Sequence, residues 1–160
     1  MKVTKRELIK IWNTLEGLTG TDYGRKFSYG IVRNKKILRD EVESLKEAQT
    51  PSKKYQEYEA ERITICAELA DKDENGSPLQ KNNQFVFTNE ENIKELNKRM
   101  KPLLEKNKDV LEDFHKKELE FEDILAEEVE LDVYLMDLDV FPEEIDPGIL
   151  EVLYVFVKEE

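Results

Sequence analysis

Apolar side chains recur at steps of three and four residues through much of this chain, which is the spacing of amphipathic helices. Thr50-Pro51 lies between the two clearest stripes, and Thr followed by Pro is a typical helix start. Two stripes of similar length joined by so short a connection predict an antiparallel helical hairpin over residues 27–48 and 51–70. The stripes are Ile31, Leu38, Val42 and Leu45, then Tyr55, Tyr58, Arg62, Ile65 and Leu69.

The composition supports a helical chain. Charged residues make up 39% of the 160 residues, against about 25% in typical soluble domains, and there are only six Gly and five Pro. Long helices with solvated faces are therefore expected. The 39% apolar content is enough to bury a core without disulfides or metal, so we predict a single domain over residues 1–160.

Further helices are indicated by their start signals. Thr4 with Glu7 three residues later forms a candidate capping box, and Thr88 with Glu91 repeats that spacing before a long helical region. Pro102 lies inside the second pattern, where a kink or break is expected. Asp146-Pro147 has the pattern of a cap with Pro at the first helical position and predicts a closing helix.

Two segments favour β structure. Residues 84–87 are short and rich in Phe and Val, and residues 131–140 alternate apolar side chains with carboxylates, apart from one slip at Leu135-Met136. The two segments could pair and pack on the helical hairpin. We therefore predict an α+β fold that is mostly helical.

Charge is distributed unevenly along the chain. Residues 118–160 contain sixteen acids and one base, Lys158, whereas residues 1–62 carry a net charge of +4 and the whole chain −12. If residues 131–140 form a strand, Asp132, Asp137 and Asp139 are displayed on a folded face. A rigid field of one sign can steer or repel particular partners.

A basic stripe could be the counterpart of residues 118–160, called here the acidic third. Residues 25–39 hold six bases and no acid, including Arg33, Lys36 and Arg39. Such a stripe could follow phosphates, but the acidity of the whole chain opposes nucleic acid as the partner. We expect the stripe to meet the acidic third instead, within one molecule or between copies.

Metal chemistry has two candidate sites. Asp71, Asp73 and Asn75 with Gly76 match the opening of a calcium-binding EF-hand loop, but position twelve is Asn82 rather than Glu. We expect a simple turn there, with calcium as the alternative. Asp137 and Asp139 would lie roughly 6–7 Å apart on one side of a strand, where two carboxylates could share a metal. Alternation alone explains that pair equally well.

Other chemistry has little support. Cys66 and His115 are the only cysteine and histidine, and they could act as nucleophile and base only if the fold brought them together. We expect a buried thiol and a surface imidazole, and no catalytic residue, metal or cofactor. The lone cysteine, the absence of an apolar leader and the absence of 18 consecutive apolar residues favour a cytoplasmic protein without a membrane partner.

Several pieces in order resemble a family of small phage and prophage proteins of unknown function from Gram-positive bacteria. The resemblance implies a phage setting and a non-enzymatic role, in the host cytoplasm or associated with the virion. It supplies no catalytic residues. The pieces are Lys26-Phe27-Ser28-Tyr29 with Arg33-Asn34, the helix at residues 58–62, residues 71–78 followed by Phe85-Val86-Phe87, residues 127–133, and the closing helix from Ile145 to Glu160.

Three functions follow from these features. The first is a phage accessory or assembly protein that is not an enzyme and binds a phage protein, a host protein or itself. The second is an acidic inhibitor that binds a host nucleic-acid-binding or defence protein, with its carboxylates mimicking the phosphates of nucleic acid. The third is a metal-dependent enzyme using Asp137 and Asp139. We favour the first, through contacts at Asp132, Asp137, Asp139, Arg33, Lys36 and Arg39.

Overall fold

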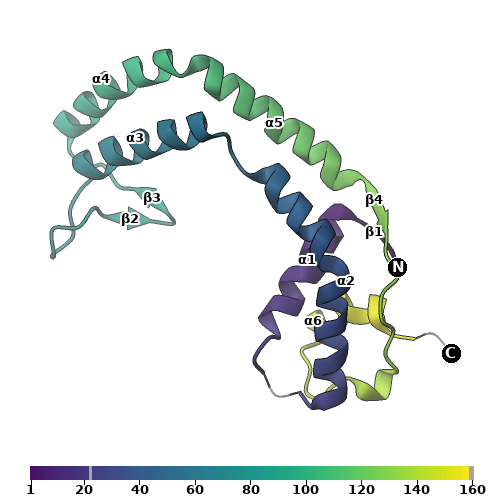
Figure 1. Cartoon of the computed structure of the whole chain (residues 1–160). Coiled ribbons are helices and arrows are strands. Elements are labelled where there is room, and N and C mark those ends of the chain that lie inside the picture. Colours follow the sequence, from purple (N-terminus) through teal and green to yellow (C-terminus); the bar gives the residue numbers. More distant parts are fainter. Residues whose placement is uncertain (22, 159–160) are drawn as a thin grey trace. The chain divides into compact units, whose positions relative to one another are not determined.

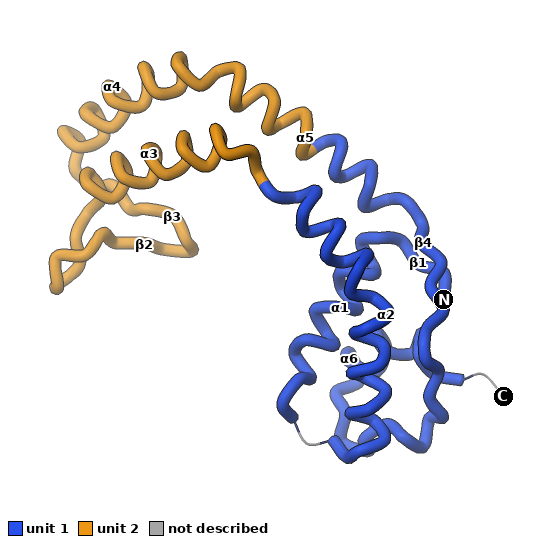
Figure 2. The backbone as a smooth tube through the Cα atoms, in the orientation of Figure 1, with its two compact units in different colours: residues 1–50, 119–160 blue, residues 51–118 orange. Residues whose placement is uncertain are grey.

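The computed structural model describes residues 1–21 and 23–158, which fold into two compact units (Figures 1 and 2). Unit 1 comprises Met1–Thr50 and Leu119–Glu160, and unit 2 comprises Pro51–Glu118. Unit 2 is thus inserted into the sequence of unit 1, and helix α5 (Lys108–Ala126) contributes residues to both. That the two units unfold together as one domain stays a prediction.

The architecture is mostly helical α+β, as predicted. Helices dominate both units, and the strands form two small antiparallel sheets. No helix in the described part of the chain is both long enough and apolar enough to cross a membrane.

Unit 1 has one hydrophobic core. Helix α1 (Lys5–Gly17) packs against α2 (Arg25–Gln49) and against α6 (Pro147–Leu153). Burial of each large apolar side chain in such a core contributes about 1.5–3 kcal/mol, which is how the short α6 is held in place. Side chains that are less than 2% exposed include Leu8, Leu15, Phe27, Leu38, Val42, Leu153 and Phe156.

The start of α1 follows the predicted capping box. The backbone N–H of Glu7 donates to Thr4 Oγ1 at 3.2 Å, and the backbone N–H of Thr4 donates to Glu7 Oε2 at 2.8 Å. Just before the cap, strand β1 (Lys2–Thr4) pairs antiparallel with β4 (Glu128–Glu130), with Val3 opposite Val129. The N-terminus is therefore tied to the beginning of the acidic third.

Unit 2 has its own smaller core. Helix α3 (Lys53–Leu69) packs on α4 (Glu90–Lys106), with Tyr58, Ile65 and Leu103 buried between them. Strands β2 (Gln80–Lys81) and β3 (Gln84–Phe85) form a hairpin closed by two asparagines with φ of 52° and 61°. Positive φ at both turn residues is the geometry of the hairpin turn that favours Asn.

The predicted helical hairpin over residues 27–48 and 51–70 is wrong. Both helices exist close to those bounds, but α2 packs on α1 in unit 1 and α3 packs on α4 in unit 2. An apolar stripe shows that a helix has a buried face, not which helix buries it. A short connection favours the neighbour in sequence, and here longer-range packing prevailed.

The predicted strand at residues 131–140 is also wrong. Met136 forms an isolated parallel bridge with Val157, and Leu138–Val140 is the short 3₁₀ helix η1. The apolar side chains from Leu135 onward do not all point to the core, since Leu135 and Leu138 are 47% and 56% exposed. The strand at residues 84–87 is confirmed in its first half, but its partner is β2.

Two helices differ in detail from their predictions. Helix α4 continues through Pro102, where a kink or break was predicted, and the break between α4 and α5 falls at Asn107 instead. The closing helix begins as predicted, with Asp146 accepting from the backbone of Gly148 and Ile149, but it tightens into the 3₁₀ helix η2 (Tyr154–Phe156). Glu159 and Glu160 lie outside the described residues.

Candidate functional site

The segment Leu135–Asp139 of unit 1, called here the acidic segment, is held at its start by hydrogen bonds to its backbone. At its start, the Asn34 side chain donates to the Tyr134 carbonyl at 2.9 Å and accepts from the Tyr134 N–H at 2.8 Å. One residue into the segment, the Met136 N–H donates to the Phe156 carbonyl, and the Lys158 N–H donates to the Met136 carbonyl, both at 2.8 Å. Met136 itself is 3% exposed. The backbone is thus fixed without being part of a sheet.

Side chains on either side of Met136 are displayed to solvent. Leu135 and Leu138 are exposed, as are Asp137 and Asp139. Asp137 faces Lys158 at 3.7 Å, but both side chains are more than 60% exposed, so this ion pair contributes little. Asp132 is likewise exposed. The acidic segment therefore presents two leucines and two carboxylates in fixed positions.

The metal hypothesis for Asp137 and Asp139 loses its geometric basis. Their predicted spacing depended on a regular strand, and η1 replaces that strand from Leu138 onward. Within the described residues, no group of three or more His, Cys, Asp or Glu is placed to hold a metal ion.

At Asp71–Gly76, the candidate calcium-binding loop, the acidic side chains have the hydrogen bonds of the expected turn. Asp73 Oδ1 accepts from the backbone N–H of Asn75 and of Ser77, both at 2.9 Å. The carboxylate of Asp71 accepts from the backbone N–H and the hydroxyl of Thr88. These oxygens hold the chain around the loop, which is the ordinary role of Asp in a turn.

Cys66 and His115 both belong to unit 2 and have the expected environments. Cys66 is 7% exposed on α3, and His115 is exposed on α5. A buried thiol in an apolar setting is poorly placed for nucleophilic attack.

The basic stripe on α2 is divided between several roles. The Arg33 guanidinium lies over the Tyr134 ring, 4.6 Å from its centroid. Lys35 forms an ion pair with Glu16 at 2.8 Å and donates a hydrogen bond to the Thr19 hydroxyl at 2.9 Å. The hydrogen bond from Lys35 to Glu16 lowers the pKa of the Glu16 carboxyl below its ordinary value. Lys36 and Arg39 are exposed and form no ion pair within the described part of the chain.

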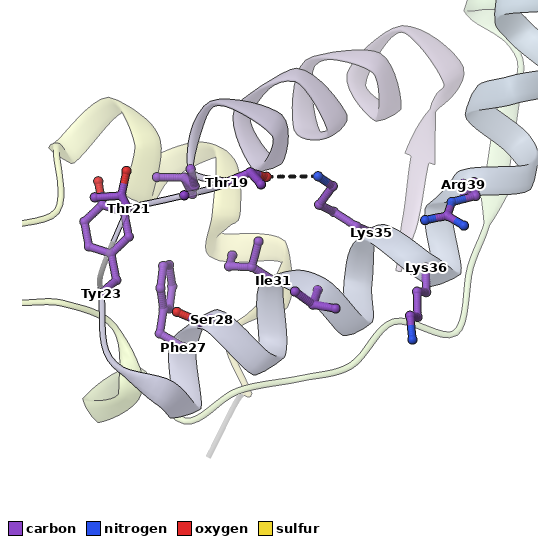
Figure 3. A pocket seen from close by; sticks show the side chains of 12 residues that line it. Thr19, Thr21, Tyr23, Phe27, Ser28, Ile31, Lys35, Lys36 and Arg39 are labelled. Atoms are coloured by element: carbon purple, nitrogen blue, oxygen red, sulfur yellow. Dashed lines mark hydrogen bonds between the residues drawn. The ribbon is translucent and has the colours of Figure 1, made fainter.

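A pocket of about 220 Å³ opens beside α2, called here the α2 pocket (Figure 3). Tyr23 and Thr21 lie at one end of it, and Lys36 and Arg39 at the other. Its surface is mainly apolar, with hydroxyls from Thr19, Thr21 and Ser28. The other lining residues are Leu18, Gly20, Phe27, Ile31, Val32 and Lys35. An apolar hollow with two unpaired bases at its rim suits an apolar side chain flanked by negative charge.

The acidic residues 118–160 form ion pairs with bases of the N-terminal part of the chain, but these bases lie outside the predicted stripe at residues 25–39. Lys2 pairs with Glu128 at 2.7 Å, Lys5 with Glu127 at 2.8 Å, and Arg6 with Glu122, so the bases at the N-terminus make these contacts. Of the six predicted interaction residues, Arg33 meets the acidic third through the Tyr134 ring and Asp137 faces Lys158. Asp132, Asp139, Lys36 and Arg39 form no ion pair in the part of the chain that the structure describes.

Sequence reasoning missed Asn34 and the α2 pocket. Asn34 is fully buried and occupies a position between Ile31 and Leu38 on the apolar stripe. A polar residue on such a stripe was the available signal, because a buried amide requires hydrogen-bonding partners. The pocket gave no local signal, since it is formed by a turn packed beside a helix. Comparison of the chain with protein-family models, with curated proteins and with solved structures found no match.

Proposed function

We propose that this protein is a non-enzymatic phage-type accessory or assembly protein that binds other proteins through unit 1. The observation that carries the proposal is the acidic segment, whose backbone is held by the buried Asn34 and around the buried Met136 while Leu135 and Leu138 remain exposed. Exposed leucines beside carboxylates match the composition of an interface with an apolar centre and a polar rim.

Fixation of the segment favours binding. Ordering a flexible loop reduces affinity, and a segment already held in one conformation avoids that cost. Asn34 and the Met136 hydrogen bonds provide the fixation here. The phage setting rests on the sequence resemblance, which implies a role in the host cytoplasm or in the virion.

Phosphate mimicry is the second candidate. Asp132, Asp137 and Asp139 are exposed near one another in sequence, and the net charge of −12 would attract a basic host protein. Such a complex should weaken steeply with salt, whereas one centred on leucines should not.

Affinity capture from infected and uninfected host lysates, repeated at two salt concentrations, tests both candidates. The variant Leu135→Ser/Leu138→Ser should lose the partner, and Asp132→Asn/Asp137→Asn/Asp139→Asn should retain it. The reverse pattern would support mimicry. Retention of every partner by both variants would contradict the proposal.

Matched controls are available in unit 2. Leu104→Ser removes a leucine that is 43% exposed, and Glu57→Gln/Glu61→Gln/Glu105→Gln removes three exposed negative charges. Neither control should change the captured partner. A loss with the controls as well would show that net charge or surface hydrophobicity, not the acidic segment, determines capture.

A further inference from the structure

The α2 pocket and the acidic segment are chemically complementary, and every copy of the chain carries both. The pocket offers an apolar surface with Lys36 and Arg39 at its rim. The segment offers the exposed Leu138 between Asp137 and Asp139. An apolar side chain flanked by two carboxylates is the kind of group that the pocket would accept.

The two surfaces face mostly different directions around α2, although Phe27 lines the pocket and also contacts Phe141 just beyond the acidic segment. An α-helix advances about 100° per residue, so Asn34, which holds the acidic segment, lies about 160° around the axis from Val32, which lines the pocket. The same geometry separates Gly30, which faces Met136, from Lys35 by about 140°. The backbone anchors keep the segment on its own flank. The pocket of one copy is thus not filled by the segment of the same copy.

The size of the pocket indicates the size of its occupant. Small-molecule sites usually measure about 300–1,000 Å³. The α2 pocket measures about 220 Å³, which suits one or two protruding side chains better than a drug-sized ligand.

We infer that the α2 pocket binds the acidic segment of a second copy of this chain, with Leu138 in the pocket and Asp137 and Asp139 beside Lys36 and Arg39. This inference rests on the proposed function, for which it names one partner. Because two different surfaces meet, the contact is head-to-tail, and it leaves a free pocket on one copy and a free segment on the other. Contacts of this type build rings or open chains.

The net charge does not prevent this contact. Each copy carries −12, and like charges repel. At 0.15 M salt the screening length is about 8 Å, so charges far from the contact are largely screened while those within it still attract. Association is therefore best measured near physiological ionic strength.

Sedimentation equilibrium of the full chain over a range of concentrations tests the inference. The unmodified chain should form dimers and larger species as concentration rises. A pocket variant, Lys36→Glu/Arg39→Glu, and a segment variant, Leu138→Ser, should each weaken self-association by about tenfold or more.

A mixture of the two variants is the decisive measurement. The pocket variant keeps an intact segment, and the segment variant keeps an intact pocket, so an equal mixture should form dimers that grow no further. Recovery of a dimer also shows that both variants are folded. The control Lys94→Glu/Lys101→Glu reverses two exposed bases on α4 and should associate like the unmodified chain.

A chain that stays monomeric up to about 1 mM, or a mixture that stays monomeric, would overturn the inference. The proposed function fails on a different result, namely partner capture that is insensitive to the acidic segment. A monomeric chain that still captures a lysate partner through Leu135 and Leu138 would therefore refute the second copy as occupant and leave the proposed function standing.

Discussion

Asn34 determines where the acidic segment lies on unit 1. Its amide satisfies both the N–H and the carbonyl of Tyr134, a residue 100 positions away in sequence. Buried hydrogen bonds add only modest net stability, but a buried polar group left without a partner is costly. A single side chain thus fixes the entry of the segment.

Asn34→Ala should therefore destabilise unit 1 by about 2–4 kcal/mol, because it leaves two backbone groups of Tyr134 unsatisfied and opens a cavity. Urea unfolding followed by fluorescence measures the effect. Asn13→Ala, at an exposed position of α1, is the matched control and should change stability by less than about 0.5 kcal/mol. Equal effects of the two substitutions would contradict the role of Asn34.

Gly30 sets a close approach between α2 and the acidic segment. A Cβ at this position would overlap Met136 Sδ and lie 3.0 Å from Met136 Cγ. Helix propensity alone would favour Ala over Gly by about 1 kcal/mol. Overpacking in a core typically costs about 1–3 kcal/mol, and Met136 is too buried to move aside freely.

Gly30→Ala should accordingly lower the free energy of unfolding, by up to about 2 kcal/mol after the helix gain is included. In a Met136→Ala background the same change should become neutral or stabilising, and a double-mutant cycle of urea unfolding measures the coupling. Stabilisation of the unmodified chain by Gly30→Ala would show that the segment does not approach α2 this closely.

At the scale of the element, the caps are the most locally encoded features. The capping box of α1, the Ser52 cap of α3 and the Asp146 cap of α6 are all formed. Each involves groups within three residues of one another. Their sequence signals were accordingly reliable for α1 and α6. The predicted starts at Thr50 and Thr88 were wrong by one or two residues, since Ser52 caps α3 and Asn89 caps α4.

The capping box of α1 also makes a pH-dependent contribution. Hydrogen bonds from the backbone N–H and the hydroxyl of Thr4 lower the pKa of Glu7 below its ordinary value of 4.5. A carboxyl whose folded pKa is lowered stabilises the protein fully above its unfolded pKa, and this contribution is lost as the pH falls through the folded value.

The stability difference between the unmodified chain and Glu7→Gln should therefore be largest above pH 4.5 and shrink below it. Thermal unfolding at several pH values measures this. Glu43→Gln, on an exposed position of α2, controls for the loss of one negative charge. A difference that grows as the pH falls would contradict the assignment.

At the scale of the whole molecule, the chain leaves unit 1 after Thr50 and returns to it at Leu119. Helix α5 contains the return point, so its backbone hydrogen bonds run continuously from unit 2 into unit 1. A helix shared in this way should couple the unfolding of the two units, because melting either half removes packing that stabilises the other.

We therefore expect one cooperative transition. Trp12 is the only tryptophan and lies in the core of unit 1, so its fluorescence reports on that unit, whereas far-ultraviolet circular dichroism reports on the helices of both. The two signals should change at the same urea concentration. Separate midpoints would show that the single domain predicted from the sequence consists of two independent ones.

The sequence by itself determined the local features of this protein. It predicted the helices at residues 27–48 and 51–70, close to the observed α2 and α3, together with the capping box of α1, the start of α6 and the exposure of Asp132, Asp137 and Asp139. These depend on groups a few residues apart, whose spacing and chemistry are visible in the chain.

Only the tertiary structure decided the partners. It paired α2 with α1 and α3 with α4, and it formed the α2 pocket. It also replaced the predicted strand at residues 131–140 with the acidic segment, whose backbone is held by hydrogen bonds outside any sheet. The contact between Asn34 and Tyr134 spans 100 residues. Within the acidic segment Met136 is the buried residue, and Leu135 and Leu138 are exposed. Such outcomes depend on competition among all the apolar faces for burial, which no local pattern records.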